Sequence, residues 1–442
     1  MITSESFLTS TLTRYPSVRR ILAAAIQSVE PGNVVNQFLR RDGNTLIIGG
    51  QNYALDQIRR IQILSLGKAS YAMASALSGP LSGLPFNGLI ISKHMSIPTL
   101  LGFEQILGGH PVPNEASLIA GQRALTLLNM VERDDLLLCL ISGGGSALMT
   151  APLPGITLDD IQSLTATLLQ SGARVDEINT LRRHLDQLKG GRIAEKVHSA
   201  DIASLILSDV VGNPLEAIAS GPTAPDPSSR EDALNVIQKY GLEKKVPKSI
   251  LDVLHQSAET PKPSDEIFNH VQNVLVGSNA QAAQAALEAA QKEGFHTQIL
   301  QTDLQGEARE VAKVICNQLK DAIKTREQPI CLIAGGETTV TVRGSGLGGR
   351  NQELALASVA ELGDMENVML IALATDGEDG PTDAAGAVVT GETLKQSAAL
   401  SLSPQRFLQE NDSYHYFNAL GELLKPGPTG TNVNDLIFCF SF

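Results

Sequence analysis

The 442-residue sequence contains no tryptophan, and aromatic residues make up only 4% of it. Proteins that bind single-stranded nucleic acid rely on aromatic side chains to stack the bases, so such a surface is not expected here. The formal net charge of −13 also argues against a polyanionic partner such as DNA. A small phosphorylated ligand stays compatible with this charge, because a local positive cluster can oppose the net sign.

Cysteine is scarce, and no pair has the CxxC spacing of a redox or zinc motif. This pattern suits a reducing compartment, with each thiol acting as a small buried hydrophobic group. His94, His110 and His184 are scattered along the chain, so no structural zinc site is predicted. His184 lies in a basic helical segment and is expected at the surface. The four cysteines are Cys139, Cys316, Cys331 and Cys439.

Long apolar runs are also missing. The run LLLCLI is too short to cross a bilayer, and the N-terminus MITSESFLTSTLTRYPSVRR does not resemble a signal peptide. We therefore expect a cytoplasmic protein with no membrane partner. No GxSxG motif appears, so serine hydrolysis has no support.

Short apolar runs alternate with longer amphipathic runs along the whole chain. Several of the apolar runs lack a polar face, as in strands covered by helices on both sides. The alternation predicts an α/β fold with mainly parallel sheets. Strands are predicted at 61–67, 87–92, 135–142, 202–208, 271–277, 329–335, 338–343, 368–375 and 435–440. Helices are predicted at 16–29, 69–78, 116–132, 158–170, 176–198, 279–292, 306–323 and 350–362.

Proline-rich segments divide the sequence. GPTAPDPSS (221–229) and ETPKPSDE (259–266) bracket a helical stretch, so the boundary between two domains is expected between 222 and 268. We predict an N-terminal domain over 1–245 and a C-terminal domain over 246–442.

Two cations stand where predicted helices begin. Lys68 follows Gly67 in LSLGKAS, and Arg350 ends the glycine-rich run RGSGLGGR. The helix dipole disfavours a cation at this end by roughly 0.3–1 kcal/mol. An anion beside each helix would reverse that cost. Lys68 is also compatible with an exposed turn, because the GxxxxGK[ST] phosphate loop is incomplete around it.

A buried strand runs into Gly143, Gly144, Gly145 and Ser146. Successive glycine amides can point at one oxyanion, although a plain glycine turn is the alternative. Asp209 directly follows another strand, where a carboxylate could hold Mg²⁺, accept a proton or cap a helix.

The segment 335–353 carries a second group of candidates. Gly335, Gly336 and Glu337 are expected to form a tight turn between two strands, whose backbone amides would help to bind substrate or nucleotide oxyanions. The GxGxxG spacing that follows matches a dinucleotide fingerprint, but no clean βαβ unit opens there, and Arg350 favours a charge-dense phosphate. A lone GxGxxG is weak evidence.

An acidic loop and a histidine complete the candidates. Asp376 follows the strand at 368–375 within ATDGEDGPTDAAGA, and such clustered carboxylates are either solvated or share a cation. Asp376 is thus a candidate to bind Mg²⁺ or to accept a hydroxyl proton. His110 in GGHPVPNEAS could line a ligand cleft.

Together these segments resemble the glycerate 2-kinase family, whose C-terminal part is called the MOFRL domain. The resemblance covers about residue 15 to the C-terminus. It rests on eight motifs in the family's order: GKAS, GGHPVPNEAS, ISGGGSAL, INTLRRHLDQLKGGRIA, LILSDVVGNPLEAIASGPT, GGETTVTVRGSGLGGRNQELAL, ATDGEDGPTDAAGA and GPTGTNVNDL.

The resemblance implies transfer of the ATP γ-phosphoryl group to the 2-hydroxyl of D-glycerate, giving 2-phosphoglycerate, with a divalent ion such as Mg²⁺. It implies two α/β/α domains, an N-terminal Rossmann-like one and a C-terminal MOFRL-type one, with the active site in the cleft between them. The family's active-site lysine and arginine fall on Lys68 and Arg350, and Asn351 lies in the same motif as a candidate binding residue. Asn114 and Asn213 stand where aspartate is common, which puts any role of those carboxylates in doubt.

Two other functions stay open at this stage. Family members are often labelled hydroxypyruvate reductases, so an NAD(P)H-dependent reductase is the main alternative. A metabolite sensor without catalysis is the third. The sequence leaves the oligomeric state open, including a homo-oligomer.

Overall fold

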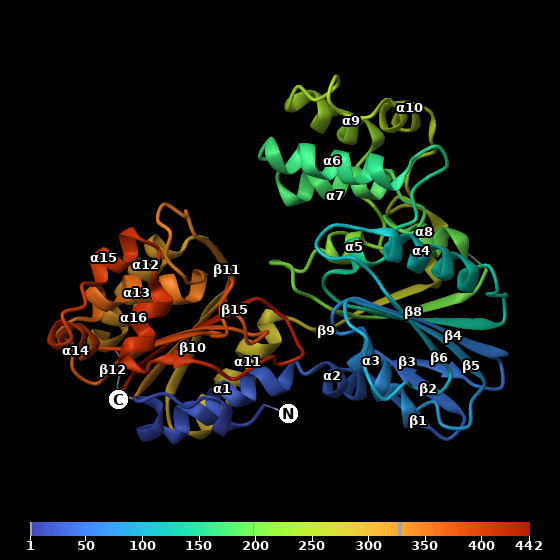
Figure 1. The fold of residues 1–442 in the computed structure, drawn as a ribbon. Helices are drawn as coiled ribbons and strands as arrows, with labels where there is room; N and C mark the ends of the chain where they lie inside the picture. The colour runs from blue at the N-terminus through green and yellow to red at the C-terminus, as the bar shows by residue number, and fades with distance from the viewer. Residues whose placement is uncertain (1, 198, 326–328) are drawn as a thin grey trace. The chain divides into compact units, whose positions relative to one another are not determined.

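The computed structural model describes residues 2–197, 199–325 and 329–442. Its contacts divide the chain into two units (Figure 1). Unit 2 is Pro31–Val276, and unit 1 combines the segment up to Glu30 with Gly277–Phe442. No helix of the described chain is long and apolar enough to cross a membrane.

Unit 2 is built on a six-stranded sheet with the order β6-β5-β4-β7-β8-β9. The pairs β4/β5, β4/β7, β5/β6 and β7/β8 are all parallel, as predicted. The strands are β4 (Arg60–Leu66), β5 (Phe86–Ser92), β6 (Phe103–Leu107), β7 (Asp135–Ile141), β8 (Asp201–Leu207) and β9 (Val271–Gly277).

Helices cover both faces of this sheet. On one face α4 (Glu115–Leu128) packs on side chains such as Leu64, Leu137 and Cys139. On the other face lie α2 (Pro31–Phe38) and α3 (Ser70–Ser75). Burial on both faces explains why β7 is apolar along its whole length. A small antiparallel sheet precedes β4, made of β1 (Leu39–Asp42), β2 (Thr45–Ile48) and β3 (Gln51–Ala54).

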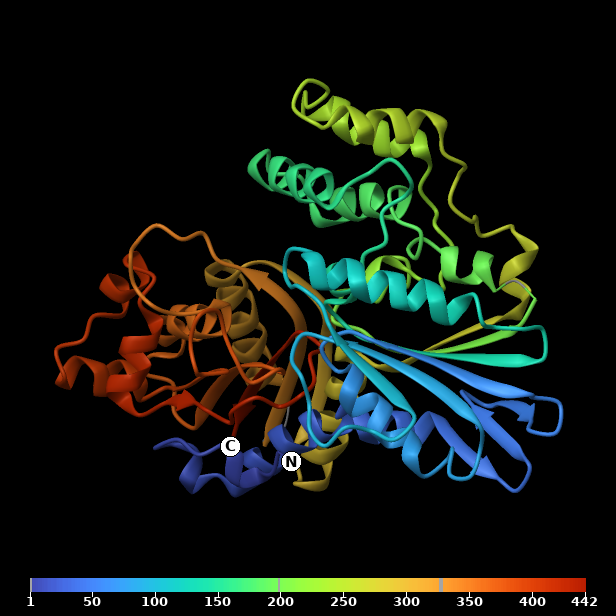
Figure 2. The same ribbon diagram turned by 45° about the vertical axis from the view of Figure 1, so that its right-hand side comes forward.

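Unit 2 also carries a separate helical cluster, which stands away from its sheet in both views (Figures 1 and 2). The cluster has its own apolar core, which includes Leu164, Leu181, Ile237 and Leu254. Its helices are α6 (Leu158–Gln170), α7 (Val175–His184), α9 (Arg230–Lys239) and α10 (Lys248–Gln256), and the remaining short helices of unit 2 are α5 (Gly145–Leu148), α8 (Arg192–Lys196), η3 (Ala76–Ser78), η4 (Ile218–Ser220) and η5 (Glu266–His270).

Unit 1 contains a six-stranded sheet with the order β10-β11-β15-β12-β13-β14. Only β10/β11 is parallel; β11/β15, β12/β15, β12/β13 and β13/β14 are antiparallel, so the expectation of a mainly parallel sheet is wrong for this unit. The strands are β10 (His296–Glu307), β11 (Ile330–Thr339), β12 (Val368–Ala374), β13 (Gly386–Thr390), β14 (Leu423–Leu424) and β15 (Asp435–Ser441).

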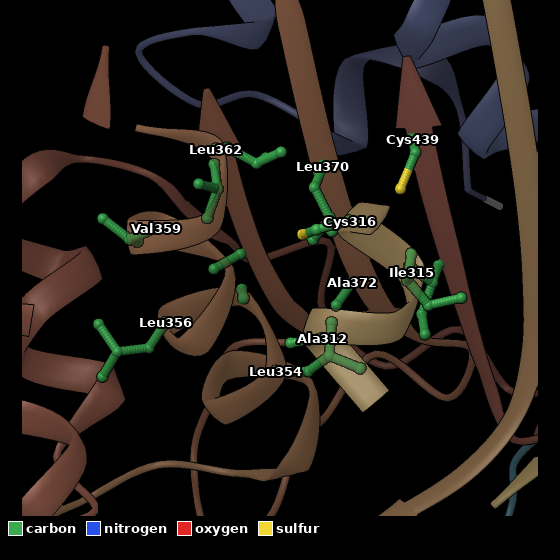
Figure 3. Close-up of a cluster of buried hydrophobic side chains, with 14 of the residues drawn as sticks. Ala312, Ile315, Cys316, Leu354, Leu356, Val359, Leu362, Leu370, Ala372 and Cys439 are labelled. Atoms are coloured by element: carbon green, nitrogen blue, oxygen red, sulfur yellow. The ribbon is translucent and has the colours of Figure 1, made fainter. Parts of the chain in front are cut away.

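Alternating residues of β15 face two different helical layers. Cys439 joins the cluster formed with α12 and α13, where Cys316, Leu354 and Leu370 also lie (Figure 3). Phe440 instead contacts Phe295, on the side of α1 and α11. Unit 1 is therefore a three-layer α/β/α body, as predicted. Its helices are α1 (Pro16–Ser28), α11 (Asn279–Lys292), α12 (Ala308–Thr325), α13 (Arg350–Leu362), α14 (Thr393–Ala399), α15 (Pro404–Gln409) and α16 (Ser413–Leu420), with η1 (Ser4–Ser6) and η2 (Leu12–Arg14).

The single domain boundary predicted at residue 245 differs from the division of the chain, in which unit 2 begins at Pro31 and ends at Val276. Helix α1 packs on α11 and so belongs with unit 1, while α10 and β9 belong with unit 2. The proline-rich segments used to place the division connect parts of unit 2 to one another.

Two local predictions are wrong. The expected turn at 335–337 and the strand at 338–343 are a single strand, β11, which ends at Thr339. The expected helix at 176–198 is, over 176–197, two helices, α7 and α8, separated by a segment with Gly190 and Gly191, which both have positive φ; residue 198 lies outside the described residues. All four cysteines are buried, as predicted.

A substitution at Gly336 tests why β11 needs a glycine at this position. Its φ is 145°, and a Cβ there would lie 2.1 Å from the Leu304 carbonyl oxygen. Gly336→Ala should therefore lower the free energy of unfolding by roughly 2–5 kcal/mol, because backbone strain and a clash with a strand add together. Chemical denaturation measures this.

Gly427→Ala is the matched control, since Gly427 also has positive φ (74°) but no atom lies within 4 Å of an added Cβ. Gly427→Ala should lower the free energy of unfolding by only about 1–2 kcal/mol. Equal losses in the two variants would contradict the proposed clash.

Candidate active site

The predicted residues of unit 2 gather where β4 and β7 end. The Lys68 amide donates to the Gly143 carbonyl (2.9 Å), and the Ala69 amide donates to Ser142 Oγ (3.0 Å). These bonds join the two loops that follow neighbouring parallel strands, where ligands of such sheets bind. We call Lys68, His110, Gly143–Ser146 and Asp209 the Lys68 cluster.

Glycine backbone lets the side chains of this cluster approach closely. A Cβ at Gly144 would lie 3.2 Å from both Lys68 Cγ and His110 Cδ2, and φ there is 84°. A Cβ at Gly143 would lie 1.8 Å from Asp209 Oδ2. Lys68, His110 and Asp209 thus share one site with the glycine loop, as residues singled out in the sequence. Their roles remain predictions.

His110 is held neutral at physiological pH. Burial lowers its pKa, and the positive charges of Lys68, Lys93 and Arg182 lower it further, to about 4. A neutral imidazole can accept or donate a hydrogen bond without adding charge. The positive charges of Lys68, Lys93 and Arg182 therefore all act on His110.

Sequence reasoning missed a second set of polar residues beside the glycine loop. Ser146 Oγ lies 2.8 Å from Ser220 Oγ, and Ser220 donates to Asn179 Oδ1 (3.4 Å). Ser220 is buried with φ 60°, and its neighbour Ala219 has φ 50°. Strained backbone of this kind is common at functional sites. Asn179 and Ser220 lie in the motifs INTLRRHLDQLKGGRIA and LILSDVVGNPLEAIASGPT, but their spacing in the sequence does not indicate that they meet.

The predicted residues of unit 1 gather around Arg350 at the start of α13. Arg350 Nε and Nη2 donate to the two carboxylate oxygens of Asp435 (2.5 and 3.1 Å), and Nη1 donates to Glu337 (2.6 Å). Burial lowers the pKa of Arg350, but the hydrogen bond and charge of Asp435 and the charge of Glu337 outweigh it and raise the pKa. We call Arg350, Glu337, Asp379 and Asp435 the Arg350 cluster.

The chain itself therefore supplies anions for the cation at this helix start. Asp379 completes the arrangement by accepting from the amides of Asn351 (3.2 Å) and Gln352 (2.9 Å). Carboxylates at a helix N-terminus are favourable, and they offset the unfavourable position of Arg350. Asn351 is buried here, and its side-chain amide also donates to Asp379.

The other candidate glycines of unit 1, within 335–346, pack closely against chain segments of the same unit. Gly335 and Gly336 pair with Leu436 and Asp435 of β15 instead of forming a turn. In the GxGxxG segment, a Cβ at Gly344 would lie 2.3 Å from Glu410 Cα, and one at Gly346 would lie 2.4 Å from Asp412 Cβ. Close chain packing explains these glycines without a dinucleotide.

Asp376 is partly buried just after β12, and its carboxylate accepts from the Glu378 amide (3.2 Å). It belongs to unit 1, whereas Asp209 belongs to unit 2. Among the described residues, no group of three or more His, Cys, Asp or Glu side chains is arranged to hold a metal ion. Mg²⁺ is usually held by one or two carboxylates and by substrate phosphates, so single carboxylates such as these fit it.

The structure shows the local roles of Asn114, Asn213 and His184. Asn114 caps α4, with its side chain accepting from the Ser117 amide (3.2 Å), a role that asparagine fills as well as aspartate. Asn213 has φ 55°, a conformation that asparagine tolerates. The prediction that His184 is exposed is wrong: it is fully buried, and its Nδ1 lies 2.9 Å from the Thr180 carbonyl oxygen.

The fold and the two clusters define an α/β protein of two units, in which cations stand beside glycine-rich loops at strand ends. Residues 17–255 match the model of a domain of unknown function, DUF4147, and residues 330–435 match the MOFRL family. The chain belongs to the glycerate 2-kinase family, as the sequence motifs predicted.

Its relatives support this membership over nearly the whole chain. It is 44% identical to the D-glycerate 2-kinase of Thermotoga maritima, over 86% of this chain and 90% of that protein. It is 37% identical to the glycerate 2-kinase of Pyrococcus horikoshii (95% of each) and 35% identical to human glycerate kinase (98% and 94%). The crystal structure of a Thermotoga maritima glycerate kinase matches with a TM-score of 0.85 and 40% identity, covering 96% of this chain and 98% of that one.

The buried carboxyl group of Asp379 gives a pH-dependent prediction. Burial raises its pKa from 3.8 to about 6, so between these values the native state holds a proton that the unfolded state has lost. The contribution of Asp379 to stability should therefore fall as the pH rises from about 4 to 6, by about 3 kcal/mol at most.

Urea unfolding of the wild type and of Asp379→Asn across this range measures the contribution. The free energy of unfolding of the wild type should exceed that of Asp379→Asn by less and less as the pH rises. Asp321→Asn, at an exposed aspartate paired with Lys324, should show no such trend. A wild-type advantage that grows with pH would contradict the assignment.

Proposed function

We propose that this chain is an ATP-dependent glycerate 2-kinase, which transfers the γ-phosphoryl group of ATP to the 2-hydroxyl of D-glycerate. The products are 2-phosphoglycerate and ADP. The observation that carries this proposal is the 44% identity, over 86% of the chain, to a protein named D-glycerate 2-kinase. The Lys68 cluster supports it, because it assembles a cation, glycine backbone and a carboxylate where neighbouring parallel strands end.

Phosphoryl transfer depends mainly on positioning and on neutralising negative charge. Lys68 extends from the turn after β4 and has no ion pair among the described residues, so its ammonium group is available to a phosphoryl oxygen. The Gly143–Ser146 loop offers backbone amides and the Ser146 hydroxyl to the same oxyanion. Arg350 supplies a second cation, held in a fixed orientation by Asp435 and Glu337.

The reaction also needs a proton acceptor. As the glycerate 2-hydroxyl oxygen bonds to the γ-phosphorus, the bond from that phosphorus to the β–γ bridging oxygen breaks, and the hydroxyl proton passes to a carboxylate. Asp209 and Asp376 are the candidates for this role and for holding Mg²⁺. When bound, Mg²⁺ would neutralise charge on the nucleotide phosphates.

One assay separates the kinase from the reductase alternative. Purified protein with D-glycerate, ATP and Mg²⁺ should release ADP, and ³¹P NMR should show a phosphate ester on the 2-hydroxyl. The same protein with hydroxypyruvate and NADH or NADPH should leave the absorbance at 340 nm unchanged. Cofactor oxidation without ADP release would reverse the assignment.

Lys68→Ala and Arg350→Ala should each lower kcat on the order of 100-fold or more, because each removes a preorganised positive group from the transferring phosphoryl. Turnover is measured by ADP release, and circular dichroism checks folding. Lys244→Ala, at an exposed lysine of unit 2, is the control and should keep wild-type turnover. Wild-type turnover in a folded Lys68 or Arg350 variant would remove that residue from the mechanism.

A further inference from the structure

Arg182 is a half-buried cation that has no counter-ion among the described residues. It lies on α7, and its Nη1 donates a single long hydrogen bond to Asn179 Oδ1 (3.3 Å). Burial lowers its pKa, and in the part of the chain that the structure describes no carboxylate pairs with it. The next residue differs sharply, since Arg183 Nε donates to the buried carboxylate of Asp226 (2.8 Å).

A chain of polar side chains ties Arg182 to the glycine loop of the Lys68 cluster. Asn179 Oδ1 accepts from both Arg182 and Ser220, and Ser220 in turn contacts Ser146 (2.8 Å). The positive charge of Arg182 also acts on His110, which lies against Gly144. Arg182 therefore belongs to the surroundings of the loop where the oxyanion is expected.

Arg350, Lys68 and Arg182 differ in the hydrogen bonds and charge that they can offer a ligand. Arg350 already uses three of its five N–H groups on Asp435 and Glu337, so only two N–H donors stay available to a ligand. Lys68 presents a point charge, which suits a phosphoryl oxygen. Arg182 keeps most of its five N–H donors unused, and a guanidinium fork matches a carboxylate in a bidentate manner.

An unpaired cation in a partly buried position is unfavourable until an anion joins it. The positive charges of Lys68 and Lys93, which also act on His110, add to the local positive potential that an anion would offset. A substrate that carries a carboxylate next to its reacting hydroxyl would supply this anion and would be oriented by it.

We propose that Arg182 binds the carboxylate of the substrate and thereby restricts the enzyme to 2-hydroxy acids over neutral polyols and amides. This inference rests on the proposed function, since it assumes that the acceptor is a hydroxy acid bound at the Lys68 cluster. The Asn179–Ser220–Ser146 chain holds the guanidinium in place relative to the glycine loop.

The first test compares D-glycerate with D-glyceramide, which has the same hydroxyls but no charge. Arg182→Gln should lower kcat/KM for D-glycerate by roughly 30- to 1,000-fold, mainly through KM, because a buried charge partner of the ligand is lost. The value for D-glyceramide should change by less than about threefold, since the amide does not use the charge. Equal losses on both substrates, or no loss on D-glycerate, would overturn the proposal.

Arg174→Gln is the matched control, because Arg174 precedes the same helix but is exposed and paired with Asp176. It should keep wild-type values on both substrates. If Arg182→Gln unfolds, as judged by its melting temperature, Arg182→Lys keeps the charge without the fork. It should retain D-glyceramide activity and lose D-glycerate affinity by a smaller factor, and unchanged affinity would overturn the bidentate assignment.

A binding measurement separates this inference from the kinase proposal. Calorimetry with D-glycerate, with and without a non-hydrolysable ATP analogue, needs no turnover. Wild-type binding that Arg182→Gln removes would support the inference even if no ADP were formed, an outcome that would overturn the kinase proposal alone. An active kinase whose Arg182→Gln variant binds D-glycerate normally would overturn the inference alone. Absence of both binding and turnover in the wild type would overturn both.

A spectroscopic readout follows the same cluster. The pKa of His110, followed by NMR, should rise from about 4 when D-glycerate binds, because the ligand's charge offsets the neighbouring cations. It should also rise in free Arg182→Gln, and it should stay below 6.5 there because burial remains. If the His110 pKa stays at about 4 both after D-glycerate binding and in Arg182→Gln, Arg182 does not act on His110 or on the bound ligand.

Discussion

The close approach of charged side chains to glycine backbone is the constraint on which both clusters depend. Asp209 lies against Gly143, Lys68 and His110 lie against Gly144, and Asp379 lies against Gly349. A side chain at any of these glycines would meet the functional group or its neighbours. The glycines therefore do more than give the loops freedom, because they let charged groups reach the ends of the strands and the start of α13.

The two clusters treat positive charge in opposite ways. Around Arg350 the chain provides carboxylates within hydrogen-bond distance, so the guanidinium is fixed before any ligand arrives. The Lys68 cluster contains one carboxylate, Asp209, beside Lys68 and neutral polar groups, and Arg182 next to it donates, among the described residues, only to the amide oxygen of Asn179. The Arg350 cluster is thus preorganised by internal neutralisation, while Arg182 is left to be neutralised by a ligand.

Much of the fold was predictable because the central strands are buried on both faces. The predicted strands at 61–67, 135–142 and 435–440 agree with β4, β7 and β15 within a residue or two. Polar or short strands gave no such signal: β10 lies at the edge of its sheet and is mostly polar, and β1 to β3 have four residues each. Gly335 and Gly336 resembled a turn, yet they sit inside β11, because β15 and β10 hold that backbone extended.

The sequence by itself determined the family and the α/β class. It also located the loops that contain Lys68, Gly143–Ser146, Asp209 and Arg350. These follow from local runs of apolar residues, glycines and charges, which are readable along the chain. Only the tertiary structure decided which charges are paired. Arg350 meets Asp435, 85 positions away, whereas Arg182 meets an amide and Arg183 beside it meets Asp226. Pairing depends on which side chains the folded sheets and helices bring within a few ångströms of each other, and sequence distance carries no information about that.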